Sequence, residues 1–195
     1  MSLKNLKLSL SAGPKPIDPL KIFKKLTLRG SIENIWDPQA EALRKWHECR
    51  VLQDNVIQMN TRGGKTLVGL LAAQSLVNEL KRRVLFVVAN NQLVEQTLLR
   101  ANDIGFNPSA RYKGKWHDRK SFESAESFCV TNYASVFNGF STFSDKDISG
   151  IIFDDAHVAE TIIRDQFTLK IPRDWGSYEQ VLKVLRRMSL PTEAQ

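Results

Sequence analysis

The chain has 195 residues, of which 42% are hydrophobic and 25% charged, values that are ordinary for a globular domain and leave little room for two. No stretch approaches the roughly 20 apolar residues of a membrane span, and the first residues lack the apolar core of a secretory signal. We therefore predict an intracellular protein, cytoplasmic or nucleoid-associated, with no membrane partner. Cys49 and Cys129 lie far apart and without metal-site spacing, so we expect two reduced thiols.

The formal net charge of +7 is concentrated at the start of the chain. Residues 1–30 hold seven Lys or Arg and one acidic residue, whereas residues 31–195 are close to neutral, with 21 basic and 20 acidic residues. We accordingly predict a basic N-terminal lead over residues 1–30 and one domain over residues 31–195. The lead could contact nucleic-acid phosphates or simply be solvated, and its charge does not decide between these.

The first half of the chain alternates between breakers and apolar runs. Gly13, Pro14 and Pro16 predict a flexible start, and residues 18–30 a short amphipathic helix or packing segment. Asp37 as a cap with Pro38 in the first turn predicts the start of a helix. Further elements follow in chain order: a short strand over residues 56–59, a loop over 60–64 and an apolar helix over 65–80.

The same order of strand and helix then repeats. The continuous apolar run 84–88 is typical of a strand buried on both faces, and residues 105–120 predict a loop or a short edge strand. The remaining expected elements are a helix over 92–102, a strand over 128–131, a short helix near 134–137, a strand over 151–153, a helix after it, and a helix over 178–188. This alternation predicts an α/β fold, with a mostly parallel sheet covered by helices on both faces.

The segment from Met59 to Thr66 predicts a phosphate-binding loop between a strand and a helix. Gly63 and Gly64 allow close backbone approach, and the helix N-terminus presents N–H groups to an anion. Lys65 places a positive charge near the β- and γ-phosphates of a nucleotide, and the Thr66 hydroxyl can bind Mg²⁺. The match is incomplete, because Met59 stands where the strict pattern has glycine.

A second candidate element is the acidic pair Asp154-Asp155, directly after an apolar strand. Ligands of parallel α/β sheets bind at the carboxyl ends of the strands, so this position suits a metal site. In phosphate-loop enzymes one such acid binds Mg²⁺ and its neighbour positions or deprotonates water. An aspartate that only caps the next helix is the alternative for the pair alone.

Several motifs occur in an order that resembles the N-terminal RecA-like domain of DEAD/DEAH-box helicases of superfamily 2, over about residues 30–160. These motifs are Gln39, residues 61–66, residues 88–96, residues 130–133 and residues 154–157. The resemblance implies a RecA-like ATPase that uses ATP and Mg²⁺ to remodel DNA or RNA, with Lys65, Asp154 and Asp155 as catalytic residues.

The resemblance also implies further contacts, residue by residue. Gln39 would recognise adenine, which a side-chain amide can do through two hydrogen bonds. Further nucleotide contacts would come from Thr61, Arg62, Gly63, Gly64, Lys65, Thr66 and Asp154, with Thr66 and Asp154 as metal ligands. Nucleic-acid backbone contacts, which carry no sequence information, would come from Asn90, Asn91, Gln92, Thr131 and Asn132. The alternative for this last group is helix caps and turns after strands.

Some residues depart from the family pattern. Arg62 replaces a usual glycine, and Asp155 replaces a usual glutamate that is one methylene longer. The later helicase motifs are missing, so we expect a second RecA-like domain as partner, and weak ATP binding with negligible hydrolysis by this chain alone. Alternatives are a degenerate nucleotide- or nucleic-acid-binding module, or a translocating subunit of a restriction or defence complex. An iron–sulfur cluster needs four cysteines, and only Cys129 lies between Thr66 and Asp154.

The stretch from Arg111 to Lys120 mixes basic and aromatic residues. This composition suits base stacking combined with phosphate attraction. It suits equally a solvated loop whose aromatic rings pack on the domain, and this is the interpretation that we favour from the sequence.

Overall fold

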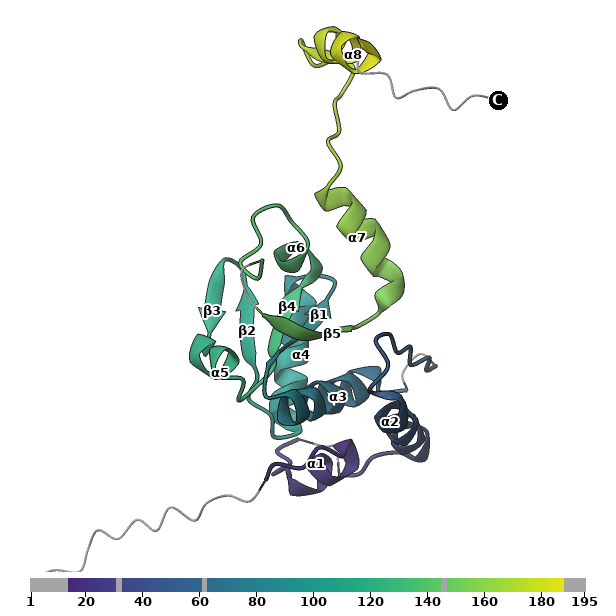
Figure 1. Cartoon of the computed structure of the whole chain (residues 1–195), viewed down its shortest axis with the longest axis vertical. Helices are drawn as coiled ribbons and strands as arrows, with labels where there is room; N and C mark the ends of the chain where they lie inside the picture. Colours follow the sequence, from purple (N-terminus) through teal and green to yellow (C-terminus); the bar gives the residue numbers. More distant parts are fainter. Residues whose placement is uncertain (1–13, 31–32, 61–62, 145–146, 188–195) are drawn as a thin grey trace, which may run out of the picture.

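A five-stranded sheet with the strand order β3-β2-β4-β1-β5 lies at the centre of the structure (Figure 1). The structure is a computed structural model that describes residues 14–30, 33–60, 63–144 and 147–187. The strands are β1 (Arg83–Val88), β2 (Ser109–Tyr112), β3 (Lys115–His117), β4 (Cys129–Asn132) and β5 (Ile148–Phe153). All neighbouring strands are parallel except β2 and β3, which form an antiparallel hairpin.

The interior strand β1, which lies between β4 and β5, is buried on both faces, as its continuous apolar run predicts. Val84, Phe86 and Val88 belong to one apolar cluster, whereas Leu85 and Val87 belong to a second cluster. Successive side chains of a strand point to opposite faces, so the sheet separates two cores. The predicted α/β fold with a mostly parallel sheet is confirmed.

Helices cover both faces of the sheet. The first cluster includes residues of α1, α2, α3 and α4, and the second includes residues of α5, α6 and α7. The helices are α1 (Pro19–Lys25), α2 (Asp37–Cys49), α3 (Lys65–Leu80), α4 (Asn91–Asp103), α5 (Arg119–Glu123), α6 (Tyr133–Val136), η1 (Ala156–Val158), α7 (Ala159–Gln166) and α8 (Tyr178–Arg187). Figure 1 shows α8 apart from the layered body. Among the described residues, no helix has the length and apolar character needed to cross a membrane.

Three expected elements differ from the structure. Residues 56–59 form no strand, and the Val56 side chain is 94% exposed. The segment 105–120 contains the β2–β3 hairpin, and β2 lies inside the sheet, parallel to β4. Helix α2 is preceded by Trp36 as cap residue, and Asp37 is its first helical residue.

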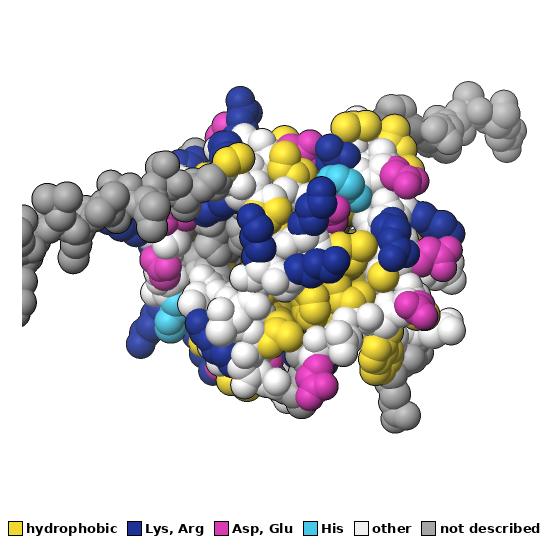
Figure 2. All heavy atoms as spheres, turned by 90° about the horizontal axis from the view of Figure 1, so that it is seen from below, with side chains coloured by type: hydrophobic (Ala, Val, Ile, Leu, Met, Phe, Trp, Pro, Cys, Tyr) yellow, Lys and Arg dark blue, Asp and Glu magenta, His cyan; other side chains and the backbone are white. Residues whose placement is uncertain are grey.

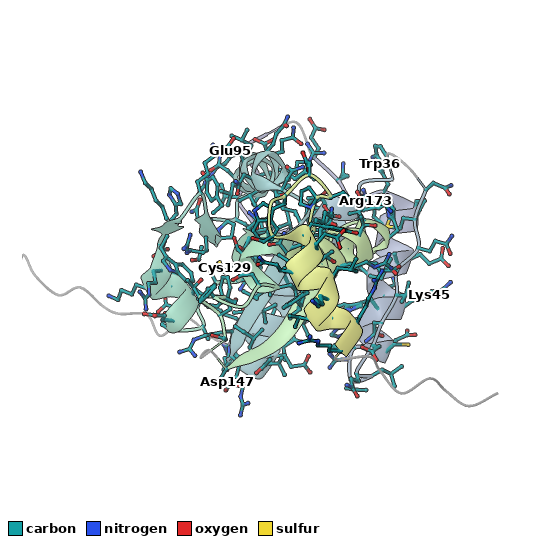
Figure 3. The ribbon with its side chains drawn as sticks, turned by 90° about the horizontal axis from the view of Figure 1, so that it is seen from above. Trp36, Lys45, Glu95, Cys129, Asp147 and Arg173 are labelled. Carbon is teal, nitrogen blue, oxygen red and sulfur yellow. The ribbon has the colours of Figure 1, made fainter. Side chains whose placement is uncertain are left out.

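The cysteines and the basic side chains can be placed in the structure. Both cysteines are free, and Figure 3 shows Cys129 inside the molecule, where burial raises the pKa of its thiol well above the usual value. The part of the basic lead that the structure describes includes Ile22 and Phe23 of α1, which pack in the first core. On the face shown in Figure 2, basic side chains are dispersed among hydrophobic and acidic ones and form no single basic patch there.

Candidate functional site

The carboxyl ends of β1, β4 and β5 bring the predicted site residues to one edge of the sheet. Phe153 of β5 is in register with Val87 of β1, and the N–H of Asp154 donates a hydrogen bond to the Val87 carbonyl at 2.9 Å. This bond continues the pairing by one residue beyond the strand. It fixes the backbone of the acidic pair beside β1.

The predicted phosphate loop ends in a left-handed glycine at the start of α3. The N–H of Gly63 donates to the Asn60 carbonyl at 3.0 Å, and Gly64 has φ +74° as the N-cap residue. Among the described residues, no side chain caps α3, and its first turn contains no acidic residue. The first N–H groups of α3 and its positive dipole end are therefore suited to an anion such as phosphate. Thr61 and Arg62 lie outside the described residues.

Gln39, a residue of α2, ties the predicted phosphate loop to that helix. Its side chain is only 5% exposed; Nε2 donates to the Gly63 carbonyl at 3.0 Å, and Oε1 accepts from the Trp36 N–H at 3.0 Å. Both ends of the amide are thus engaged inside the protein. Recognition of adenine by Gln39, as the sequence predicts, would require the amide to exchange these partners.

Lys65 and Asp155, 90 positions apart in the sequence, form an ion pair. The distance from Lys65 Nζ to Asp155 Oδ1 is 3.2 Å, and the two side chains are 39% and 48% exposed. Asp155 has φ +50°, a left-handed conformation between β5 and η1 that aims it back toward α3. A surface pair of this kind contributes little to stability, about 0–1 kcal/mol. A nucleotide phosphate can therefore replace Asp155 as the partner of Lys65 at small cost.

Asp154 is more enclosed than its neighbour. Burial, and then the adjacent charge of Asp155, raise the pKa of the Asp154 carboxyl above its usual value, while Lys65 acts in the opposite direction. The Tyr133 hydroxyl donates to the Asp154 carbonyl at 2.8 Å. Burial and the two carboxylates raise the pKa of Tyr133 to about 12, so its hydroxyl remains a proton donor at neutral pH.

The oxygen donors of this edge fit Mg²⁺ bound together with a nucleotide. Within the described ranges, no three or more His, Cys, Asp or Glu side chains gather as a metal cage. Mg²⁺ commonly takes one or two protein oxygens and completes its shell with phosphates and water. Thr66, at the start of α3, offers a hydroxyl, and Asp154 offers a carboxylate. When bound, the ion would neutralise charge that develops on the phosphates.

The residues predicted to bind nucleic acid act first as structural residues. Asn90 Oδ1 accepts from Leu93 N at 2.9 Å and caps α4, and Asn132 Oδ1 accepts from Ser135 N at 2.8 Å and caps α6. Asn132 Nδ2 also donates to Asn91 Oδ1 at 2.7 Å, which leaves the Asn91 amide oriented as a donor. Gln92 is exposed in the first turn of α4.

Thr131 does not reach the surface. Its side chain is fully buried, and its hydroxyl donates to the Arg111 carbonyl at 2.7 Å, between β4 and β2. The prediction that Thr131 contacts nucleic acid directly is therefore wrong for this structure, because β4 is buried along its whole length.

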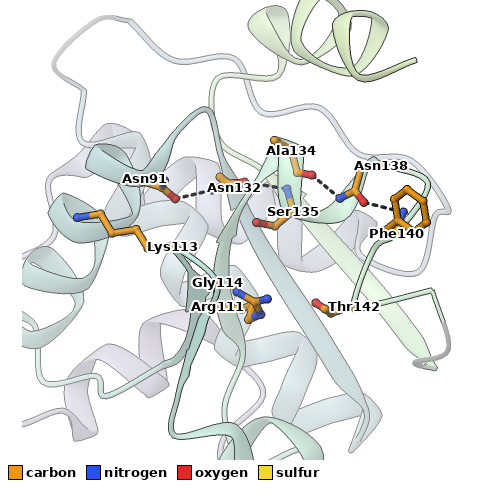
Figure 4. A pocket seen from close by; sticks show the side chains of 10 residues that line it. All are labelled: Asn91, Arg111, Lys113, Gly114, Asn132, Ala134, Ser135, Asn138, Phe140 and Thr142. Atoms are coloured by element: carbon orange, nitrogen blue, oxygen red, sulfur yellow. Dashed lines mark hydrogen bonds between the residues drawn. The ribbon is translucent and has the colours of Figure 1, made fainter. Parts of the chain in front are cut away.

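A surface pocket of about 310 Å³ joins Asn91 and Asn132 to residues that the sequence did not assign to the site (Figure 4). Arg111 and Lys113 come from the β2–β3 hairpin, and Phe140 comes from the loop after α6. The basic and aromatic composition around residue 111 is a sequence signal that could have assigned Arg111 and Lys113 to the site. Phe140 had no such signal, because its place depends on how the loop folds.

A family model described as "Type III restriction enzyme, res subunit", named ResIII, matches residues 33–190. The chain belongs to the ResIII family. The ResIII domain is a superfamily 2 helicase-like ATP-binding domain, so the predicted resemblance is confirmed at that level. No curated protein matches the sequence of this ResIII domain at a significant level.

The raised pKa of Asp154 predicts that its charged carboxylate lowers the stability of the ResIII domain, although the same carboxylate would serve as a ligand for Mg²⁺. The folded state holds the Asp154 proton more tightly than the unfolded state, so stability is lost as pH rises through the folded-state pKa. Without nucleotide at pH 7, Asp154→Asn should therefore raise the melting temperature by about 2 °C. The same change should weaken Mg²⁺-nucleotide binding, because an amide is a poorer Mg²⁺ ligand than a carboxylate.

Thermal melts between about pH 4 and 8 test this prediction. The advantage of Asp154→Asn should shrink as pH falls below the raised pKa, where the wild-type carboxyl is protonated. The exposed Asp174 offers a matched control, since Asp174→Asn should leave the melting temperature unchanged at pH 7. A variant less stable than wild type at pH 7 would contradict the assignment of Asp154 as a destabilising charge.

Proposed function

We propose that this ResIII domain is the ATP-binding half of a nucleic-acid motor that couples ATP hydrolysis to remodelling of nucleic acid. The observation that carries the proposal is the contact between Lys65 at the start of α3 and Asp155 after β5. It joins an uncapped helix N-terminus, a lysine and an acidic pair, which together are the groups needed to bind a nucleotide phosphate and its Mg²⁺.

Each residue has a role in the proposed reaction. Gly63, Gly64 and the first N–H groups of α3 bind the phosphates, and we expect Thr61 and Arg62 to add nucleotide contacts. Thr66 and Asp154 bind Mg²⁺, and Lys65 stabilises the charge that develops on the γ-phosphate. Arrival of ATP takes Lys65 away from Asp155, which frees this carboxylate to position or deprotonate the attacking water. Gln39 exchanges its contacts for the adenine base.

The nucleic-acid face lies next to the proposed ATP site. Asn91, Gln92 and Asn132 stand at the ends of β1 and β4, where small polar groups can contact phosphates without reading sequence. Asn132 directly precedes Tyr133, whose hydroxyl binds the Asp154 carbonyl. A short covalent and hydrogen-bonded path therefore connects the two faces. We infer that DNA or RNA bound at Asn132 affects the acidic pair along this path.

The partners complete the proposal. A second RecA-like domain would supply the arginines that complete the ATP site, so turnover is expected from the protein in which both domains are joined. The description of the family, the res subunit of a type III restriction enzyme, supports a translocating subunit of a restriction or defence complex as the setting. A module that binds nucleotide or nucleic acid without turnover is the alternative.

Phosphate release from ATP, measured on the two-domain protein with and without DNA or RNA, tests the proposed function. We expect nucleic acid to stimulate turnover in the wild type, and Asp155→Asn to reduce stimulated turnover on the order of 100-fold or more. Asp174→Asn is the matched control and should behave like wild type. Equal turnover in the presence and absence of nucleic acid would contradict a motor, and no turnover in any sample would favour the binding module.

A further inference from the structure

We propose that Phe140 stacks on a base of single-stranded nucleic acid whose backbone lies on Arg111 and Lys113. This inference rests on the proposed function and deepens it, because it names the form of nucleic acid and a residue that selects that form. The three side chains all line the pocket in Figure 4, Arg111 and Lys113 from the β2–β3 hairpin and Phe140 from the loop after α6.

The loop after α6 presents one phenylalanine to solvent and buries another. The Phe140 side chain is 98% exposed, whereas Phe143, three residues later, is only 5% exposed. The Phe143 ring packs against those of Trp116 and Phe122, with centroid distances of 5.6 and 6.1 Å. The hydrophobic effect thus anchors the loop through Phe143 and leaves Phe140 without an internal partner among these rings.

Hydrogen bonds fix the base of this loop. The Phe140 N–H donates to Asn138 Oδ1 at 2.8 Å, and Asn138 Nδ2 donates to the Ala134 carbonyl. The Ser141 hydroxyl donates to the Ser135 carbonyl at 3.1 Å. The backbone on either side of Phe140 is therefore held to α6. A ring presented on a fixed backbone loses little conformational freedom when it binds a ligand.

The opposite wall of the pocket carries two basic side chains, Arg111 and Lys113. Arg111 Nε is buried and has no hydrogen-bond partner within the part of the chain that the structure describes. Arg111 lines the pocket, and a guanidinium carries further N–H donors besides Nε that can serve a ligand. Lys113 binds Glu95 at 2.6 Å but keeps a 59% exposed side chain, and the Asn91 amide adds a neutral donor. Phosphate oxygens match this set of donors.

The combination of groups selects a single strand. Phosphate donors alone would serve a duplex or a free phosphate equally well. An exposed ring at the rim of the pocket gains energy only from a base whose face is free, as in single-stranded DNA or RNA. In a duplex the bases already stack on each other, so Phe140 would add little.

Fluorescence anisotropy with labelled oligonucleotides tests the inference on the whole chain. Four probes are compared: single-stranded DNA, single-stranded RNA of the same sequence, an abasic strand of equal length and a duplex. Phe140→Ala should weaken binding of at least one base-containing single strand on the order of tenfold, and leave binding of the abasic strand and the duplex unchanged. The DNA and RNA arms show which sugar the site accepts, and Phe140→Trp should restore binding.

Two controls separate the possible outcomes. Phe167→Ala removes another exposed ring, one that does not line the pocket, and should bind every probe like wild type. Arg111→Gln should weaken the base-containing and abasic single strands alike. Wild-type binding that Phe140→Ala leaves unchanged, or lowers equally for the abasic strand, overturns the role of Phe140 while leaving the proposed function intact. No binding of any probe by the wild type overturns both.

Discussion

Replacing Lys65 with alanine is expected to lower the affinity for MgATP roughly 30-fold or more, because a phosphate then loses its charged hydrogen-bond partner. The same change should barely affect folding. Lys65 makes one ion pair, with Asp155, and both side chains are partly exposed, which limits the contribution of that pair to stability. We therefore expect Lys65→Ala to weaken nucleotide binding strongly and to leave stability nearly unchanged. This combination is typical of a lysine that binds a ligand.

Isothermal titration calorimetry for affinity, together with thermal melts for stability, measures both effects of Lys65→Ala. Lys45→Ala is the matched control, since Lys45 also makes one exposed ion pair, with Glu41 in α2, away from the loop. The control should bind MgATP like wild type. If Lys65→Ala bound MgATP as tightly as Lys45→Ala, the anion site at the start of α3 would be assigned wrongly.

Gly64→Ala is expected to abolish measurable MgATP binding and to destabilise the domain by about 1–3 kcal/mol. The backbone of Gly64 has φ +74°, which costs an L-residue roughly 1 kcal/mol, and the new Cβ would lie 2.1 Å from Gln39 Nε2. Gln39 would have to move, and its hydrogen bonds to Gly63 and Trp36 would break. The phosphate loop would then lose its attachment to α2.

The structure offers a close control for this substitution. Gly114 has φ +76°, but a Cβ there would meet no atom within 4 Å. Gly114→Ala therefore reports the backbone strain alone, and chemical denaturation of both variants isolates the cost of the collision with Gln39. In a double-mutant cycle, Gln39→Ala should recover part of the stability that Gly64→Ala loses. Equal losses for Gly64→Ala and Gly114→Ala would show that Gln39 does not hold the loop.

Much of the layered fold follows from local patterns in the sequence. The run of β1 places apolar residues on both faces of the strand, and such a run is stable only between two cores, so its position inside the sheet was predictable. Glycine and lysine before an apolar helix, and two aspartates after an apolar strand, likewise specify ends of elements. In the structure α3 packs against β1 and β5, and its first residue, Lys65, pairs with Asp155 directly after β5.

Other features depend on pairing that no local pattern encodes. Residues 56–59 have apolar and β-branched side chains, yet a strand exists only where a neighbour offers a ladder of hydrogen bonds, and these residues have none in the structure. Conversely, β2 contains a charged residue and still joins the sheet, because the Thr131 hydroxyl and the edge of β4 bind it.

The site contains two further features of this kind. The internal contacts of Gln39 and the exposure of Phe140 both depend on how segments meet in space. Gln39 lies 24 residues before the carbonyl that it binds, and the anchor of the Phe140 loop is a ring cluster that includes β3 and α5. Sequence motifs indicate which chemistry is present, whereas these contacts decide which atoms remain available for a ligand.

The most direct test of the account is a calorimetric titration of the wild-type chain with ATP, in the presence of Mg²⁺ and again with the metal chelated. We predict weak, saturable binding of one ATP per chain that needs Mg²⁺, because Thr66 and Asp154 act on the phosphates through the ion. Absence of binding at millimolar MgATP, or binding that is the same without Mg²⁺, would contradict it.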